Sequence, residues 1–220
     1  MKQIDTLLFD WDGTLLNSRD AVIDAVYHTA EVYVPGLFTR EDLVMRFGES
    51  FDQFIEIVEE SGDGSYGKGH ILATYLEYAN TNSSRSLQLF DGVAEELALL
   101  KQEGYALAIV TNKQRALAYA ELERFEVAHY FQKIFTLDDV RAGKPEPDML
   151  LAAMQALGSH PAHTLMIGDS EYDLLAAQAA GVSCAILDWH GPRDWQKAAP
   201  TYRCSRLSSL LQELRGVKTS

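Results

Sequence analysis

Runs of apolar residues alternate along much of this chain with segments whose apolar positions recur at helical spacing. The first run, residues 4–9, ends abruptly at polar residues, which is typical of a buried strand. After residue 90 the alternation is regular. It predicts strands at 105–111, 133–137, 164–167 and 182–187, and helices at 93–103, 114–124, 147–157 and 172–180. Strands that alternate with helices predict an α/β fold, with a Rossmann-like parallel sheet covered by helices.

Residues 19–86 interrupt this alternation with four segments of helical period and no strand pattern between them. The first ends at Pro35-Gly36, and the second begins at Thr39, where Asp42 three residues on is typical of a capping box, and extends to Gly48. The other two helices are expected at 51–60 and at about 71–79, before a polar run at 80–86.

This pattern predicts two domains. Residues 1–18 and 87–220 are expected to form the α/β core, and residues 19–86 an inserted all-helical domain. A chain of 220 residues with 47% apolar content is large enough to bury a proper core in this arrangement.

The net charge of the chain limits the kinds of partner that it can bind. The chain carries 19 basic and 32 acidic residues, a formal net charge of −13, and no run of Lys or Arg suited to a nucleic-acid backbone. We therefore expect no nucleic-acid partner. Because an acidic protein repels anions at long range, a site for a phosphorylated substrate would need local cations, from a metal and a lysine.

The cysteine content and the hydropathy argue against a disulfide-rich, zinc-binding or membrane-spanning protein. Cys184 lies within an apolar run and is expected to be a small core residue, and with Cys204 it supports neither a disulfide framework nor a zinc site. The chain contains no apolar span of 18 residues and opens directly into a strand. We expect a soluble, cytoplasmic protein with no membrane partner.

Polar residues that could take part in catalysis or bind a ligand follow the predicted strands. They are Asp10 and Asp12 after the first strand, Thr111, Asn112 and Lys113 after the second, Lys144 in the loop before a helix, and Asp169 and Asp173 after the fourth. Because the carboxyl ends of parallel strands share one edge of a sheet, these groups can meet in one pocket. Asp10 and Asp12 can point into it together if strand geometry persists through Trp11, and two like charges so close need a cation.

In order and type these segments resemble the four motifs of the haloacid dehalogenase superfamily. The motifs are DxDGT at Asp10–Thr14, a strand-end Thr at Thr111, a Lys at Lys144 and GDxxxD at 168–173. The resemblance is closest to the branch that contains phosphoglycolate phosphatases, whose helical cap is inserted after the first motif. This chain departs from that branch at Trp11, where Leu is common, and at Asn17, where Asp is frequent.

The resemblance implies a role for each motif. Asp10 would be the nucleophile that forms an aspartyl phosphate, and Asp12 the general acid and base. Mg²⁺ would be bound by Asp10, the backbone carbonyl of Asp12, and Asp169, with Asp173 behind these ligands.

Three further groups would bind the phosphoryl oxygens of the substrate. By resemblance these are the ammonium group of Lys144, the Thr111 hydroxyl and the Asn112 backbone amide. The implied activity is a Mg²⁺-dependent phosphatase acting on a small phosphorylated metabolite, such as phosphoglycolate or a sugar phosphate.

Other interpretations of the same residues remain open. Asp12 can be a turn cap, and Asp169 and Asp173 can be ordinary acids at a helix N-terminus. A phosphosugar mutase would share the aspartyl phosphate, and a non-enzymatic receiver-like switch uses a similar set of residues, although such modules are shorter and carry no helical insertion. The sequence indicates no oligomeric state.

Overall fold

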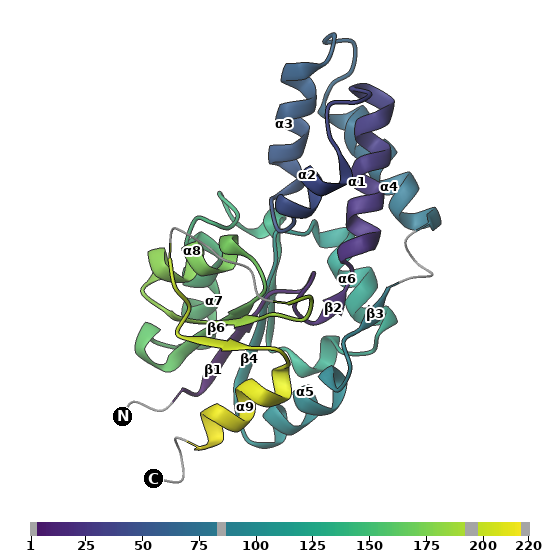
Figure 1. The fold of residues 1–220 in the computed structure, drawn as a ribbon. Helices are drawn as coiled ribbons and strands as arrows, with labels where there is room; N and C mark the ends of the chain where they lie inside the picture. The colour runs from purple at the N-terminus through teal and green to yellow at the C-terminus, as the bar shows by residue number, and fades with distance from the viewer. Residues whose placement is uncertain (1–3, 83–86, 192–197, 217–220) are drawn as a thin grey trace. The chain divides into compact units, whose positions relative to one another are not determined.

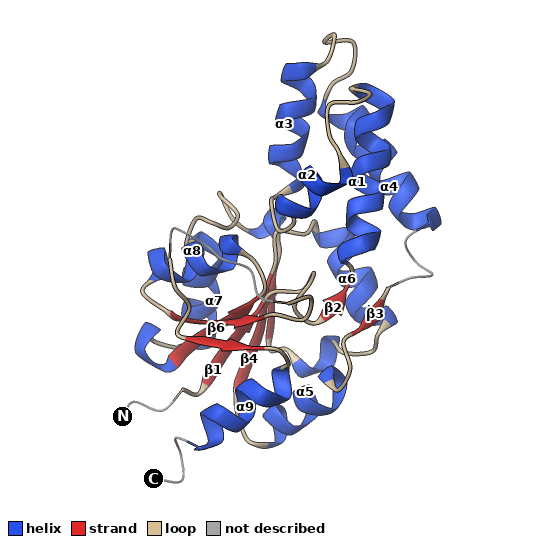
Figure 2. Cartoon of the chain, viewed as in Figure 1, coloured by secondary structure: helices blue, strands red, loops and turns tan. Residues whose placement is uncertain are grey.

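The computed structural model describes residues 4–82, 87–191 and 198–216. Contacts within the chain divide it into two compact units, Met1–Leu16 with Leu89–Ser220, and Asn17–Gln88. The ribbon of the first unit is a twisted sheet with helices on both faces, and that of the second is entirely helical apart from its ends (Figures 1 and 2).

The first unit is built on a six-stranded sheet in which every neighbouring pair is parallel. The strands are β1 (Thr6–Phe9), β4 (Ala106–Val110), β5 (Lys133–Phe135), β6 (Thr164–Gly168), β7 (Ser183–Leu187) and β8 (Tyr202–Cys204), in the order β5-β4-β1-β6-β7-β8. The α/β prediction is therefore confirmed. The chain leaves β1 towards β4 and leaves β6 towards β7, so the carboxyl ends of β1 and β6 border the crevice where such sheets bind ligands.

Alternation along the strands supplies the apolar faces of the sheet. Leu8, Met166 and Ile186 belong to one buried cluster with residues of α7 (Asp148–Leu157) and α8 (Glu171–Ala180). Cys184 lies in the same cluster, as predicted for a small core residue. Figure 2 shows the remaining helices of this unit away from α7 and α8; they are α5 (Val93–Gln102), α6 (Arg115–Arg124) and α9 (Leu207–Gly216).

One predicted strand is shorter than its apolar pattern indicates. Residues 133–137 were expected to be extended, but β5 ends at Phe135, because Thr136 caps the 3₁₀ helix η3 (Leu137–Asp139) through a capping box with Asp139. Two other 3₁₀ helices, η2 (Ala128–Tyr130) and η4 (Pro161–His163), precede β5 and β6.

The second unit packs its helices around an apolar cluster of its own. They are α1 (Arg19–Tyr33), α2 (Arg40–Met45), α3 (Phe51–Ser61) and α4 (Lys68–Asn82). The cluster includes Ile23 of α1, Phe54 of α3 and Ile71 of α4, all at most 5% exposed. These contacts stabilise helices that would be marginal alone.

Two helix boundaries in this unit test the sequence patterns. The capping box of Thr39 with Asp42 is confirmed. The prediction that this helix reaches Gly48 is wrong, because α2 ends at Met45 and Gly48 takes a positive φ of 103° that a continuing helix does not allow. The polar run at 80–86 is helical as far as Asn82, and residues 83–86 lie outside the described part of the chain.

The chain passes between the units along two short strands that pair with each other, β2 (Leu16–Asn17) and β3 (Gln88–Leu89). Across the described ranges, every helix is too short or too polar to span a bilayer.

Candidate active site

Three carboxylates meet where β1 and β6 end. Asp10 directly follows β1, Asp169 directly follows β6, and Asp173 lies in the first turn of α8. One carboxylate oxygen of each lies within 4.8 Å of the others, and all three residues are buried. Their oxygen atoms are the hard donors that divalent cations such as Mg²⁺ prefer, so the cluster fits such an ion.

Lys144 places a positive charge inside this cluster. Its Nζ lies 2.8 Å from Oδ1 of Asp10 and 2.5 Å from Oδ1 of Asp173, and its side chain is 2% exposed. Burial opposes the charge on Lys144, but the attraction of Asp10 and Asp173 outweighs it, so the pKa of the ammonium group is raised. Lys144 is therefore a fixed cation at the end of β1.

At Asp10 the effect of burial outweighs the attraction of the lysine, so the neutral form of its carboxyl is favoured. Burial raises the pKa of its carboxyl from 3.8 to about 8; Lys144 opposes this rise, and the neighbouring Asp173 and Asp169 add to it. A cation bound among these oxygens would favour the ionised form of Asp10.

Asp173 is held firmly by its surroundings. Its Oδ2 accepts hydrogen bonds from the Ser170 hydroxyl at 2.7 Å, the Ser170 amide at 3.0 Å and the Asp169 amide at 3.2 Å. Asp173 thus closes the capping box of α8, which is the ordinary role for an acid at this position, and it also binds Lys144. With both oxygens engaged, it is suited to orient its neighbours.

Two glycines allow the acids to approach the backbone. A Cβ on Gly168 would lie 2.3 Å from Cγ of Asp173, and a Cβ on Gly13 would lie 2.6 Å from Oδ2 of Asp169. Gly13 also has a φ of 78°, which other residues rarely adopt. The hydroxyl of Thr14 donates to Asp169 at 3.4 Å, a contact that the sequence pattern does not predict.

Asn112 contributes more than its backbone. Its side-chain amide donates to the Lys144 carbonyl and accepts from the Lys144 amide, both at 2.8 Å, so it fixes the loop that carries Lys144. A Cβ on Gly143 would lie 2.6 Å from the same Asn112 oxygen. Thr111 is 1% exposed at the end of β4, and its hydroxyl accepts from the Lys113 amide at 3.2 Å.

Asp12 differs from the expectation that it shares a cation with Asp10. The backbone does not continue as a strand through Trp11, whose carbonyl instead accepts turn hydrogen bonds from residues 14–16. The Asp12 carboxylate is outside the acidic cluster and contacts Lys113, whose Nζ lies 2.9 and 3.0 Å from its two oxygens. Each acid of the DxD pair therefore has a lysine of its own.

Lys113 also binds Glu121 of α6, at 2.8 Å, and Trp11 donates its indole N–H to the same Glu121 oxygen at 2.7 Å. Burial raises the pKa of Glu121 against the opposing effect of Lys113. The sequence pattern places Lys113 at this edge of the sheet but does not predict its contact with Glu121 or the contact of Trp11 with Glu121. The only local signal for this group is a lysine directly after the strand-end Thr-Asn pair, because Glu121 lies 110 positions from Trp11.

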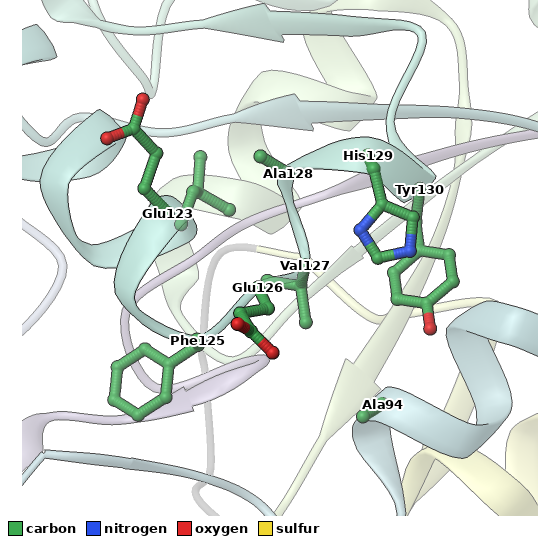
Figure 3. A pocket seen from close by; sticks show the side chains of 9 residues that line it. Ala94, Glu123, Phe125, Glu126, Val127, Ala128, His129 and Tyr130 are labelled. Carbon is green, nitrogen blue, oxygen red and sulfur yellow. The ribbon is translucent and has the colours of Figure 1, made fainter.

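A separate hollow of about 590 Å³ lies beside the end of α6 and η2 (Figure 3). None of the predicted site residues line it. Its lining includes Glu123 and Glu126 but neither Lys nor Arg, so it is a poor site for an anionic substrate. The acidic cluster with its lysine is the better candidate.

Comparisons with known proteins agree with this geometry. The sequence profile described as haloacid dehalogenase-like hydrolase matches residues 7–187. The chain is 34% identical over 219 residues to Pyrophosphatase PpaX of Halalkalibacterium halodurans, which covers 98% of this chain and 99% of that protein.

Solved structures with the same fold include two at 26% identity. A candidate haloacid dehalogenase-like hydrolase from Bacteroides fragilis superposes with a TM-score of 0.79, covering 94% of this chain and 100% of that one. A candidate phosphoglycolate phosphatase from Lactobacillus plantarum superposes with a TM-score of 0.81, covering 96% and 99%.

Proposed function

The chain belongs to the haloacid dehalogenase-like hydrolase family, and on this basis we propose that it is a Mg²⁺-dependent phosphatase of a small phosphorylated metabolite. The observation that carries the proposal is the convergence of Asp10, Lys144 and Asp169 in one buried cluster. Oxygen ligands for a divalent cation and an ammonium group for a phosphoryl group then occupy the same place.

Asp10 is the proposed nucleophile. Its carboxylate oxygen attacks phosphorus, the bond between phosphorus and the leaving oxygen breaks, and an aspartyl phosphate forms. Water then attacks the phosphorus of this intermediate, which releases inorganic phosphate and restores the Asp10 carboxylate. Two easier displacements replace one difficult one.

Asp12 is the proposed proton carrier. In the first step it gives its proton to the leaving oxygen, and in the second it takes a proton from the attacking water. Its side chain is 20% exposed, more open than that of Asp10 at 8%, which suits a group that must exchange a proton with substrate and water.

Lys144, Thr111 and Asn112 are the proposed binding groups for the phosphoryl oxygens. Lys144 has three N–H donors, of which two point at Asp10 and Asp173. The residues that would hold Mg²⁺ are Asp10, Asp169 and the carbonyl of Asp12, with Asp173 behind them. When bound, Mg²⁺ supplies positive charge that neutralises the phosphoryl oxygens.

Two kinds of leaving group are proposed for the substrate. The family branch suggests phosphoglycolate or a sugar phosphate, and the helical unit is the proposed cap domain that selects among such monoesters. The similarity to a protein named pyrophosphatase over almost the full length favours inorganic pyrophosphate as a second candidate. Both kinds of substrate present a terminal phosphoryl group to the same cluster.

A phosphate-release screen tests the proposal. The purified protein is assayed with pyrophosphate, phosphoglycolate, sugar phosphates and aryl phosphates, with Mg²⁺ and with excess chelator. We expect release of phosphate from at least one compound, only with the divalent cation. A protein that releases none from the whole panel would contradict the proposal.

The same assay separates the alternatives. A phosphosugar mutase would convert a sugar phosphate into an isomer without releasing phosphate, which product analysis detects. A receiver-like switch would instead keep a long-lived phosphoryl group on Asp10 after treatment with acetyl phosphate. The match to a hydrolase family disfavours the switch.

A further inference from the structure

Outside the acidic cluster, four polar contacts form a ring that runs from the Asp12 side chain through Lys113 and Glu121. Lys113 contacts both oxygens of Asp12, at 2.9 and 3.0 Å, and Oε2 of Glu121 at 2.8 Å. The Lys113 side chain is only 7% exposed and that of Glu121 13%. A lysine so enclosed between two carboxylates has little freedom to move away from either.

Trp11 closes the ring. Its indole N–H donates to the same Glu121 oxygen at 2.7 Å, and its side chain is fully buried. Because Trp11 and Asp12 are consecutive, the contacts start and end on the same loop after β1 and pass through the β4–α6 segment between them. The position of Asp12 is therefore set by its own neighbour, through Glu121 and Lys113.

The contacts of Lys113 with Asp12 keep the Asp12 carboxylate away from the acidic cluster. One carboxylate oxygen from each of Asp10, Asp169 and Asp173 lies within 4.8 Å of the others, and Asp12 is only two residues from Asp10. A free carboxylate there could turn towards a bound cation, where it would be lost to proton transfer. By binding both oxygens of Asp12, Lys113 restricts its rotation and holds it apart from the other acids.

We propose that Lys113, anchored by Glu121 and Trp11, is a positioning residue that holds the Asp12 carboxylate where it can exchange a proton with the leaving group. The inference rests on the proposed function, since it assumes that Asp12 is the general acid. Lys113 itself does not touch the phosphoryl group in this account. Its effect is exerted only through Asp12.

The choice of leaving group distinguishes a positioning role of Lys113 from a purely structural one. A structural defect would lower kcat/KM equally for all leaving groups, whereas a misplaced general acid lowers it most for leaving groups that need a proton. Phenyl phosphate and p-nitrophenyl phosphate differ little in size, but p-nitrophenolate is a stable anion that departs with little help from an acid, whereas phenolate needs the proton. Because kcat/KM reports the steps up to departure of the leaving group, it isolates the acid role of Asp12 from its later role with water.

The experiment compares Lys113→Met with wild type on both aryl phosphates at saturating Mg²⁺. We expect kcat/KM to fall about tenfold or more for phenyl phosphate and less than about threefold for p-nitrophenyl phosphate. Lys113→Arg should recover most of the loss, because a guanidinium group can also bind both carboxylate oxygens. Trp11→Phe, which keeps an aromatic side chain but removes the N–H, should show the same selectivity more weakly.

Lys133→Met is the matched control, because Lys133 is an exposed lysine of the same unit, on β5. It should leave both values unchanged. An equal loss on both substrates in Lys113→Met, or no loss on either, would overturn the inference while leaving the proposed phosphatase intact.

A crystal structure of Lys113→Met gives a second readout that does not depend on activity. The Asp12 carboxylate is expected to leave the place that it occupies beside Lys113. An unchanged Asp12 in a folded Lys113→Met protein would overturn the inference even if no phosphate ester were hydrolysed, whereas absent wild-type activity alone would contradict only the proposed function.

Discussion

At the scale of single residues, two lysines divide the acids of the site into separate groups. Lys144 binds Asp10 and Asp173, and Lys113 binds Asp12. The division matters because the proposed nucleophile and the proposed proton carrier need different surroundings. Asp10 is enclosed among other acids, whereas Asp12 is partly open to solvent.

Enclosure of Asp10 predicts a dependence of stability on pH in metal-free protein. Its carboxyl has a pKa of 3.8 when unfolded and about 8 when folded, so the folded state binds the extra proton between these values. The stabilisation from that proton is complete below pH about 4 and is lost as the pH rises towards 8.

Asp10→Asn removes this titration. In chelator, its free energy of unfolding relative to wild type should increase from pH 5 to pH 8 by about 1 kcal/mol or more. Denaturant unfolding of both proteins at several pH values measures this difference. A difference in the free energy of unfolding that stays constant from pH 5 to pH 8 would show that Asp10 does not carry the proton.

A second residue-scale prediction concerns Gly168. Gly168→Ala would place a Cβ 2.3 Å from Cγ of Asp173, whose oxygens are held by Ser170 and Lys144. We expect a loss of about 1–3 kcal/mol in the free energy of unfolding and at least a tenfold loss of phosphatase activity.

Gly69→Ala is the control for this substitution, since an added Cβ on Gly69 meets no atom within 4 Å and the residue lies in α4. It should be neutral or slightly stabilising. Activity in Gly168→Ala equal to that of Gly69→Ala would mean that the position of Asp173 is unimportant.

The site residues themselves were predictable to a limited degree. Asp10, Asp169 and Asp173 stand at strand or helix ends, so their convergence follows from the parallel topology. Lys144 lies in the loop before α7, and its contacts with Asp10 and Asp173 depend on the path of that loop. The contact of Trp11 with Glu121 was not predictable, because the two side chains meet only after α6 has packed. The roles of all these residues in catalysis stay predictions.

At the scale of secondary structure elements, the start of α8 joins stability to the site. Ser170 is its N-cap, and Asp173 completes the capping box while binding Lys144. A single hydroxyl group therefore both begins the helix and holds an acid of the cluster.

Ser170→Ala should cost about 1–2 kcal/mol in the free energy of unfolding and also lower phosphatase activity. Ser50→Ala offers a matched comparison, because Ser50 forms the same capping box with Gln53 at the start of α3. It should show a similar loss of stability with activity retained. Equal phosphatase activity in the two variants would show that the Ser170 cap stabilises α8 but does not contribute to the activity of the site.

The elements were predicted well where they are long and periodic. Strands β1, β4, β6 and β7 and helices α5 to α8 lie within two residues of their expected bounds. The strands β2 and β3 were missed because two residues carry no period. Helix α9 is not among the helices predicted from the pattern, although its leucines at 207, 210, 211 and 214 recur at helical spacing.

At the scale of the whole molecule, the charge of −13 opposes the approach of an anionic substrate. Lys144 and a bound cation act only at short range. Raising the ionic strength from about 0.02 M to about 0.2 M screens the distant charges more than contacts inside the site.

We therefore expect kcat/KM to increase with added KCl, by about twofold, while Mg²⁺ is kept saturating. The measurement is a series of initial rates for the best substrate of the screen. A steady fall in kcat/KM over this range would indicate that attraction near the site outweighs the overall repulsion.

The proposed function depends on transfer of the substrate's phosphoryl group to Asp10. Rapid mixing of enzyme, Mg²⁺ and substrate, followed by acid quench and mass spectrometry, tests it most directly. A transient gain of one phosphoryl group is expected on the peptide that contains Asp10, with neither label nor turnover in Asp10→Asn. Label on another residue, or undiminished phosphate release by Asp10→Asn, would contradict it.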